Sequence, residues 1–158
     1  MRVVVLTLLI GLFLHPLTAD AAPIKAVLLG VALINSSLEP VSDAEQERLE
    51  RLKTELGVLL SASGRYEIVP FDAELQNPSE LNNCSACRIK LGHAAGADQV
   101  VWGTVQKVSN LILNINIYID DVESGRSLIG ASIDIRGNTD ESWQRGIRYL
   151  VKHNILHE

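Results

Sequence analysis

The feature that most constrains the fold is an apolar run at residues 24–34, with the sequence IKAVLLGVALI. Lys25 is the one charged residue in this run, so neither face of the segment has a polar pattern. Such a continuous run is typical of a strand that is covered on both faces. The sequence therefore predicts that the chain begins its fold with a central strand of a covered sheet.

A long helix is predicted after this strand. Ser42 and Glu45 have the spacing of a capping box, and Gly64 is a natural residue for the end of the helix. Leucines recur at helical period and form one apolar stripe: Leu49, Leu52, Leu56, Leu59 and Leu60. The charged residues are expected to lie mostly off this stripe and to face water: Glu45, Glu47, Arg48, Glu50, Arg51 and Lys53.

The middle of the chain is less regular. Residues 66–71 predict a short strand that Pro70 limits, and the polar residues 72–83 predict a long exposed loop. A short helix is expected to start after Asn82 or Asn83, either of which can cap it, and to end at Gly96.

The C-terminal part alternates between apolar and polar residues. Residues 99–108 predict a strand, and residues 111–120 and 127–136 predict two more that a hairpin connects. A last helix is expected to begin at Asn138 or Thr139. The predicted order is β-α-β-α-β-β-β-α, an α/β fold with a single mixed sheet of about five strands and a C-terminal antiparallel meander.

The first 21 residues have the three parts of a secretion signal. Arg2 supplies a positive charge, an apolar run follows, and Ala19 and Ala21 form a small-residue cleavage site before Ala22. We expect residues 1–21 to be a cleavable signal peptide and residues 22–158 to form a single domain in the periplasm. The apolar run is too short to cross a bilayer comfortably, and no second one follows, so no membrane span is expected.

The composition excludes several classes of partner. The chain is 47% hydrophobic and 21% charged, which is ordinary for a globular protein. Its net charge of −5 includes no basic patch of the kind that neutralises phosphates, so nucleic acid is not expected as a partner. No nucleophile motif or phosphate-binding glycine pattern is present, and the sequence predicts neither an enzyme nor a bound cofactor.

Cys84 and Cys87 form a C-x-x-C motif at the predicted start of a helix. Three roles are open to them: a structural disulfide in an oxidising compartment, a redox pair whose thiolate the helix start stabilises, or a pair of metal ligands. With His93 their spacing does not match a common zinc site. Asp120, Asp121 and Glu123 are an alternative, weaker set of ligands for a hard cation.

The junction between the last predicted strand and the last helix is the second candidate site. It comprises Gly137, Asn138, Thr139, Asp140, Glu141, Ser142 and Trp143. It is able to present free helix amides and a large aromatic side chain to a partner. The structural alternative is that Asn138 and Glu141 form a capping box and that Trp143 begins the buried stripe of the helix.

Two resemblances come from longer stretches. The segments SGRYEIVP, GADQVVWGTVQKVSN and INIYIDDVESGRSL resemble envelope domains of the TolB amino-terminal and curli-secretion-lipoprotein type. The segments CSAC, GADQVVWGTVQKVSNLILNINIYI and DIRGNTDESWQRGIRYL resemble a family of short secreted bacterial proteins classed as a domain of unknown function. This second resemblance implies an accessory protein of a periplasmic quinoprotein alcohol oxidation system.

The sequence thus predicts a non-enzymatic accessory or interaction domain with a protein partner in the periplasm or envelope. The sheet edge and residues 137–143 are the expected contact surfaces. The alternatives are a thiol-disulfide redox protein that uses Cys84 and Cys87, and a small periplasmic protein that binds or delivers a metal.

Overall fold

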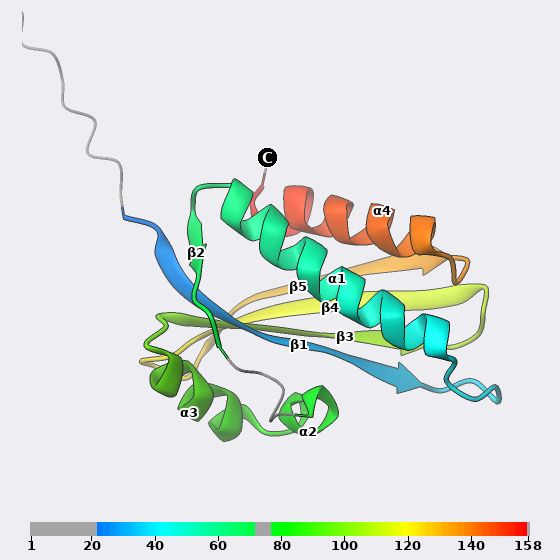
Figure 1. The fold of residues 1–158 in the computed structure, drawn as a ribbon, viewed down its shortest axis with the longest axis horizontal. Coiled ribbons are helices and arrows are strands. Elements are labelled where there is room, and N and C mark those ends of the chain that lie inside the picture. The colour runs from blue at the N-terminus through cyan, green and yellow to red at the C-terminus, as the bar shows by residue number, and fades with distance from the viewer. Residues whose placement is uncertain (1–21, 72–76, 158) are drawn as a thin grey trace, which may run out of the picture.

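The computed structural model describes residues 22–71 and 77–157. They form five strands and, on the two faces of the sheet, several helices (Figure 1). In chain order the elements are β1 (Ile24–Asn35), α1 (Asp43–Ala62), β2 (Tyr66–Ile68), α2 (Pro78–Asn82), α3 (Ser85–Ala95), β3 (Gln99–Lys107), β4 (Ile112–Asp121), β5 (Ser127–Arg136), α4 (Asp140–Leu150) and η2, a π-helical turn (Val151–Ile155).

The strands form one mixed sheet in the order β2-β1-β3-β4-β5. β1 pairs in parallel with both β2 and β3, whereas β3, β4 and β5 follow one another as an antiparallel meander. The predicted α/β class, the mixed sheet of five strands and the antiparallel C-terminal part are confirmed.

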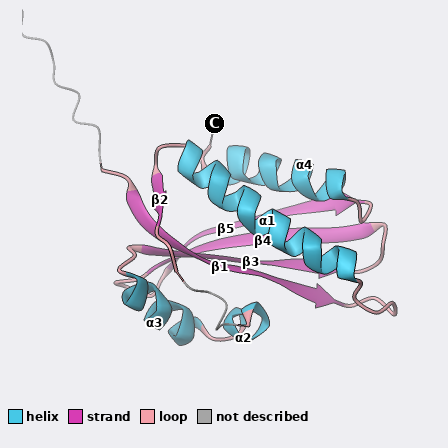
Figure 2. Ribbon diagram, in the orientation of Figure 1, coloured by secondary structure: helices cyan, strands magenta, loops and turns pink. Residues whose placement is uncertain are grey.

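Helices α1 and α4 lie on one face of the sheet and α2 and α3 on the other (Figure 2). A hydrophobic core lies on each face. The larger core lies under α1 and α4, where the predicted leucine stripe of α1 meets the odd-numbered isoleucines of β4. The smaller core lies under α2 and α3 and includes Val27 and Leu29 of β1. Residues of β1 enter both cores, so the prediction of a strand covered on both faces is confirmed.

Close packing of α4 on the sheet depends on Gly146. A Cβ atom at this position would lie 2.6 Å from a side-chain methyl of Ile135 and 3.1 Å from one of Ile115. Contacts this short would force the helix away from the sheet. The missing side chain therefore lets α4 lie directly on β4 and β5.

Several local predictions were wrong. Residues 72–83 are not all loop, because Pro78–Asn82 forms α2 and buries Leu81 in the smaller core. Helix α3 starts at Ser85 with Cys84 as its N-cap, not with Asn82 or Asn83. Strand β2 ends at Ile68, two residues before Pro70. Each error concerns a short element, for which tertiary contacts outweigh local sequence preference.

The predicted signal peptide, residues 1–21, lies outside the described residues. Among the residues that the structure describes, no helix has the length and hydropathy needed to cross a membrane.

Candidate functional site

Three chain connections meet at one end of the sheet, the right-hand end in Figure 1. They are residues 36–42 between β1 and α1, residues 108–111 between β3 and β4, and residues 137–139 between β5 and α4. Backbone hydrogen bonds join them: Ser36 N–H donates to the Lys107 carbonyl, and Asn138 N–H donates to the Asn110 carbonyl. We call this region the loop end.

Asn138 is the polar centre of the loop end. Its side-chain amide donates to Glu45 Oε1 at 2.7 Å and to Asn110 Oδ1 at 3.1 Å. Its carbonyl oxygen accepts from the indole nitrogen of Trp143 at 3.0 Å. One side chain therefore links α1, the β3–β4 hairpin and α4.

The predicted capping box of Asn138 and Glu141 is wrong. Thr139 is the N-cap of α4, and its hydroxyl accepts from the N–H of Ser142. Asn138 instead makes the tertiary bonds described above. Trp143 begins the buried stripe as predicted and is 2% exposed, so it supports the junction from below and does not present its ring to a partner.

Beneath the junction, Glu45 and Lys107 form a buried ion pair. The two side chains are 1% and 2% exposed, and Lys107 Nζ lies 2.7 Å from Glu45 Oε1. Glu45 was expected to face water, and this prediction was wrong. It fails because the Glu45 side chain bonds back to the Ser42 backbone at 2.8 Å, as a capping box requires, and that geometry directs it under the loop end.

The surroundings of Glu45 keep it ionised. Burial by itself would raise the pKa of this carboxyl group, but hydrogen bonds from Lys107, Ser42 and Asn138 lower it from 4.5 to about 2. Glu45 is therefore ionised at neutral pH. Because both charges are away from water, their partners must stay in place, and the network holds the three connections together.

The solvent side of the loop end carries aliphatic side chains. Leu38 is fully exposed, and Leu111 is 60% exposed. Val41, Val108 and Ile112 are also exposed. Aliphatic side chains on two of the loops thus face water on a base that buried hydrogen bonds fix.

Cys84 and Cys87 are joined in a disulfide. The Cys84 sulfur also accepts a hydrogen bond from the Cys87 backbone N–H at the start of α3. Cys87 is exposed to solvent. The structure thus brings the two predicted cysteines together, at a place remote in the sequence from residues 137–143.

A second buried ion pair follows the disulfide. Arg88 Nε lies 3.1 Å from Asp120 Oδ2, and the indole nitrogen of Trp102 donates to the same oxygen at 2.8 Å. The Arg88 guanidinium carbon lies 3.8 Å from the centre of the Trp102 ring, which stacks on Tyr118. This cluster attaches α3 to β3 and β4.

Asp120 is therefore engaged with Arg88 and Trp102 and not with Asp121 and Glu123, the other two members of the alternative cation set. Within residues 22–71 and 77–157, no group of three or more His, Cys, Asp or Glu side chains is arranged to hold a metal ion.

The sequence analysis missed the exposed aliphatic residues and both ion pairs. A signal for Lys107 was present, because it follows Val101, Gly103 and Val105 at the inward-facing positions of its strand. The aliphatic residues have a weaker signal, since Val108 and Leu111 flank the polar pair Ser109–Asn110 between two predicted strands. That Leu38 lies at the same end of the sheet follows only from the fold.

One family model matches residues 24–155. The chain belongs to the DUF3280 family. This family has the description "Protein of unknown function (DUF2380)", and the match confirms the resemblance to a domain of unknown function. No curated protein matches the chain.

Solved structures share the fold of this DUF3280 member. Lipoprotein GNA1162 from Neisseria meningitidis is 16% identical with a TM-score of 0.55, over 75% of this chain and 84% of that one. The PelC dodecamer from Paraburkholderia phytofirmans is 16% identical with a TM-score of 0.53, over 84% and 88%. The LpoB C-terminal domain from Salmonella enterica is 12% identical with a TM-score of 0.50, over 75% and 87%. The expected wider resemblance is thus confirmed at the level of the fold.

Proposed function

We propose that the chain is an exported, non-enzymatic domain that binds a protein partner in the bacterial envelope through the loop end. The observation that carries this proposal is the exposure of Leu38 and Leu111 on a base fixed by the buried Glu45–Lys107 pair. The two leucines lie on adjoining loops, since Asn110 next to Leu111 donates a hydrogen bond to Glu39 next to Leu38. Grouped, exposed aliphatic side chains are typical of protein interaction surfaces.

The rigidity of this base is the physical reason for favouring the loop end. Loops that are already ordered lose little conformational entropy when a partner binds. Asn138, which bonds to Glu45 and Asn110, fixes residues 137–139 against the β3–β4 hairpin before any partner arrives. The role of residues 137–143 is then to hold the exposed loops, with Gly137 to Ser142 at the margin of the contact.

Export is the second part of the proposal. Residues 1–21 have the pattern of a cleavable signal, and one neighbour with this fold is the lipoprotein GNA1162. The N terminus of protein recovered from the periplasm should be Ala22. Sequencing from that end checks it, and a retained Met1 would contradict export.

Within this role, the resemblance to short secreted proteins favours a component of a periplasmic quinoprotein alcohol oxidation system as the partner. A purified quinoprotein dehydrogenase from the same bacterium is the probe, and its binding to the immobilised domain is the measurement. This partner is supported if the dehydrogenase binds the domain and if the double change Leu38→Asp with Leu111→Asp removes that binding. No binding of the dehydrogenase to the domain would contradict this partner.

The general proposal is tested with paired variants. A double change, Leu38→Asp with Leu111→Asp, should remove partner binding, because it places charge in a contact that excludes water. Val58→Asp is the control, since Val58 is as exposed as Leu111 but lies on α1. A photo-cross-linker at position 38 should capture a defined envelope protein, and the same group at position 58 should not. Equal capture at both positions would contradict the proposal.

A thiol-disulfide function is the second candidate, because the disulfide lies at the start of α3 with Cys87 exposed. A helix start stabilises a thiolate and so favours reduction of the bond. The reduction potential decides between the roles. A value near those of thiol-disulfide oxidoreductases favours redox function, and a strongly reducing value favours a structural bond.

A further inference from the structure

Strand β5 is a long edge of the sheet. It has ten residues and pairs with β4 on one side, and no other described strand pairs with it. Gly137 N–H donates to the Leu111 carbonyl on the β4 side. In an antiparallel strand the direction of the backbone groups alternates, so the even-numbered residues of β5 direct their N–H and C=O groups to the open edge.

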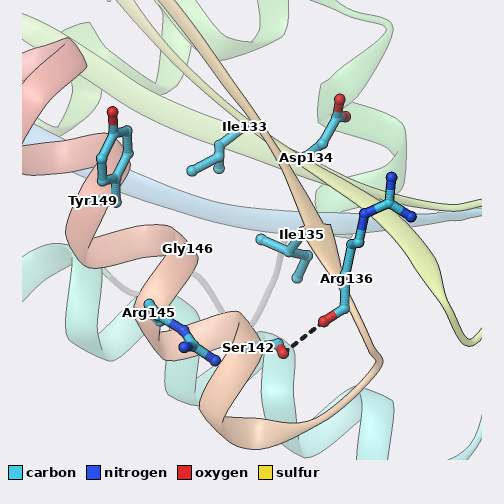
Figure 3. A pocket seen from close by; sticks show the side chains of 8 residues that line it. All are labelled: Ile133, Asp134, Ile135, Arg136, Ser142, Arg145, Gly146 and Tyr149. Atoms are coloured by element: carbon cyan, nitrogen blue, oxygen red, sulfur yellow. Dashed lines mark hydrogen bonds between the residues drawn. The ribbon is translucent and has the colours of Figure 1, made fainter.

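The last of these outward groups already has a partner. Ser142 Oγ donates to the Arg136 carbonyl at 2.8 Å (Figure 3). This bond closes the edge at the start of α4. Gly130, Ser132 and Asp134 remain as the central outward-facing positions for a strand that lies alongside β5.

A groove runs next to this edge, between β5 and α4 (Figure 3). Its volume is about 320 Å³, and its apolar lining includes Ile133, Ile135 and the half-exposed ring of Tyr149. Gly146 also lines the groove, at the place where α4 packs closely on Ile135. Side chains from one face of an added strand would enter this space.

The charged residue on the helix side of the groove is Arg145. Its side chain is 71% exposed, and its single described ion pair is with Glu141 of the same helix at 3.4 Å. Asp134 belongs to the opposite face of β5, where it accepts from Asn114 of β4. The groove lining thus includes two guanidinium groups, from Arg136 and Arg145, and one carboxylate, from Asp134, so its charge is positive.

We propose that the partner adds an extended segment to the edge of β5 as a sixth strand. Alternate apolar side chains of this segment fill the groove, and an Asp or Glu on the same face pairs with Arg145. Main-chain bonds to Gly130, Ser132 and Asp134 supply affinity, while the groove and the charge supply specificity. This inference rests on the proposed function, since it describes how the same partner makes a second contact.

Charge favours this occupant over a second copy of the chain. The helix-facing residues of β5 are Ile129, Ala131, Ile133 and Ile135, none of which is acidic. A second β5 added in antiparallel fashion would fill the groove with apolar groups, but it would bring another Arg145 and no carboxylate on the helix-facing side of its strand, where Asp134 does not lie. An acidic, alternating segment satisfies both the groove and the arginine.

The first test maps the contact. A photo-cross-linker at Ser132 of the exported protein, activated in the native envelope, should attach to a partner segment that alternates apolar residues and contains Asp or Glu. Attachment to β5 of another copy, to a helical segment, or to no protein would each overturn the inference. Cross-linking from position 38 to the partner without cross-linking from position 132 would leave the proposed function standing and remove this inference alone.

The second test uses variants of the edge and of the charge. Ser132→Pro removes an outward N–H and should lower cross-linking from position 38 about tenfold, while Ser132→Ala leaves it unchanged. Thermal unfolding shows whether Ser132→Pro still folds. If Ser132→Pro does not fold, the variant Arg145→Glu is the test. This variant should weaken partner binding about tenfold, and replacing the partner's acidic residue with Lys should restore the binding. Unchanged binding in Arg145→Glu, or no restoration, would overturn the inference.

Discussion

The two buried ion pairs found among residues 22–71 and 77–157 have similar chemistry but different surroundings. Glu45 and Lys107 lie beneath the loop end, where amide and hydroxyl groups of Ser42 and Asn138 complete the hydrogen bonds of the carboxylate. Arg88 and Asp120 lie under α3, where the Trp102 ring covers the guanidinium and its indole nitrogen binds the carboxylate.

Because their surroundings differ, the two ion pairs hold different parts of the structure in place. The first pair joins the first turn of α1 to the last residue of β3, beneath the loops that carry the exposed aliphatic side chains, so it keeps that surface in one shape. The second pair attaches a short helix to strands that already pair with each other. Arg88 also donates to the carbonyls of Leu81 and Asn82, which fix α2 relative to α3. We therefore expect the first pair to be the more sensitive to loss of one partner.

The largest effect is expected from Lys107→Met. It leaves the Glu45 carboxylate buried without its cation and should lower the free energy of unfolding by about 3–5 kcal/mol. The double variant Glu45→Gln with Lys107→Met removes both charges and should lose less. Urea denaturation measures both, and a loss in Lys107→Met no greater than in the double variant would mean that the pair is not coupled.

The second-largest effect is expected from acid, which should lower the free energy of unfolding by protonating Glu45 beneath the loop end. The pKa of Glu45 is about 2 in the folded protein, below its ordinary value of 4.5, so its contribution to stability is present above pH 4.5 and is lost as the pH falls from 4.5 to 2. This contribution is about 3 kcal/mol. Unfolding free energies at pH 5 and pH 2.5 measure it. The double variant, which lacks Glu45, should show a correspondingly smaller decrease, and an equal decrease in both proteins would exclude Glu45 as its source.

Asp120→Asn should have a smaller effect and lower the free energy of unfolding by about 1–3 kcal/mol. The Asn oxygen still accepts from Trp102 or Arg88, and Arg88 keeps its bonds to the carbonyls of Leu81 and Asn82. Asp134→Asn on exposed β5 is the control. Circular dichroism during denaturation provides the measurement. A loss above that of Lys107→Met would reverse the ranking of the two pairs.

The smallest effect is expected from replacing both Cys84 and Cys87 with Ser. The bond closes a very short loop, so its removal should lower stability by about 2 kcal/mol or less and leave the fold intact. Mass spectrometry with and without reductant should first show that the two cysteines of periplasmic protein are bonded to each other. An unfolded double variant would show that the disulfide, and not Arg88, fixes α3.

The regular elements were predictable because their signals are local. The alternation of residues 111–120 and 127–136 identified β4 and β5, and the leucine period identified α1. Short α2 was missed because five residues carry too little periodicity. Glu45 was misplaced because helical period describes the side of a helix, whereas Glu45 lies in the first turn and folds back over the cap.

The candidate site, too, was predictable only where its signals are local in the sequence. The sequence alone identified the two cysteines as a possible disulfide and residues 137–143 as a helix start with Trp143 buried. It did not show that Asn138 bonds to Glu45, 93 residues earlier, nor that the groove next to β5 contains Arg145.

What the sequence by itself determined is therefore the set of long elements, their order and the mixed character of the sheet, because hydrophobic period and capping act within a few residues. The tertiary structure alone decided which charges are buried, which loops meet and which strand edge stays open. Those features depend on contacts between Lys107 and Glu45, or between α4 and β5, that exist only after the sheet has formed and that no local pattern encodes.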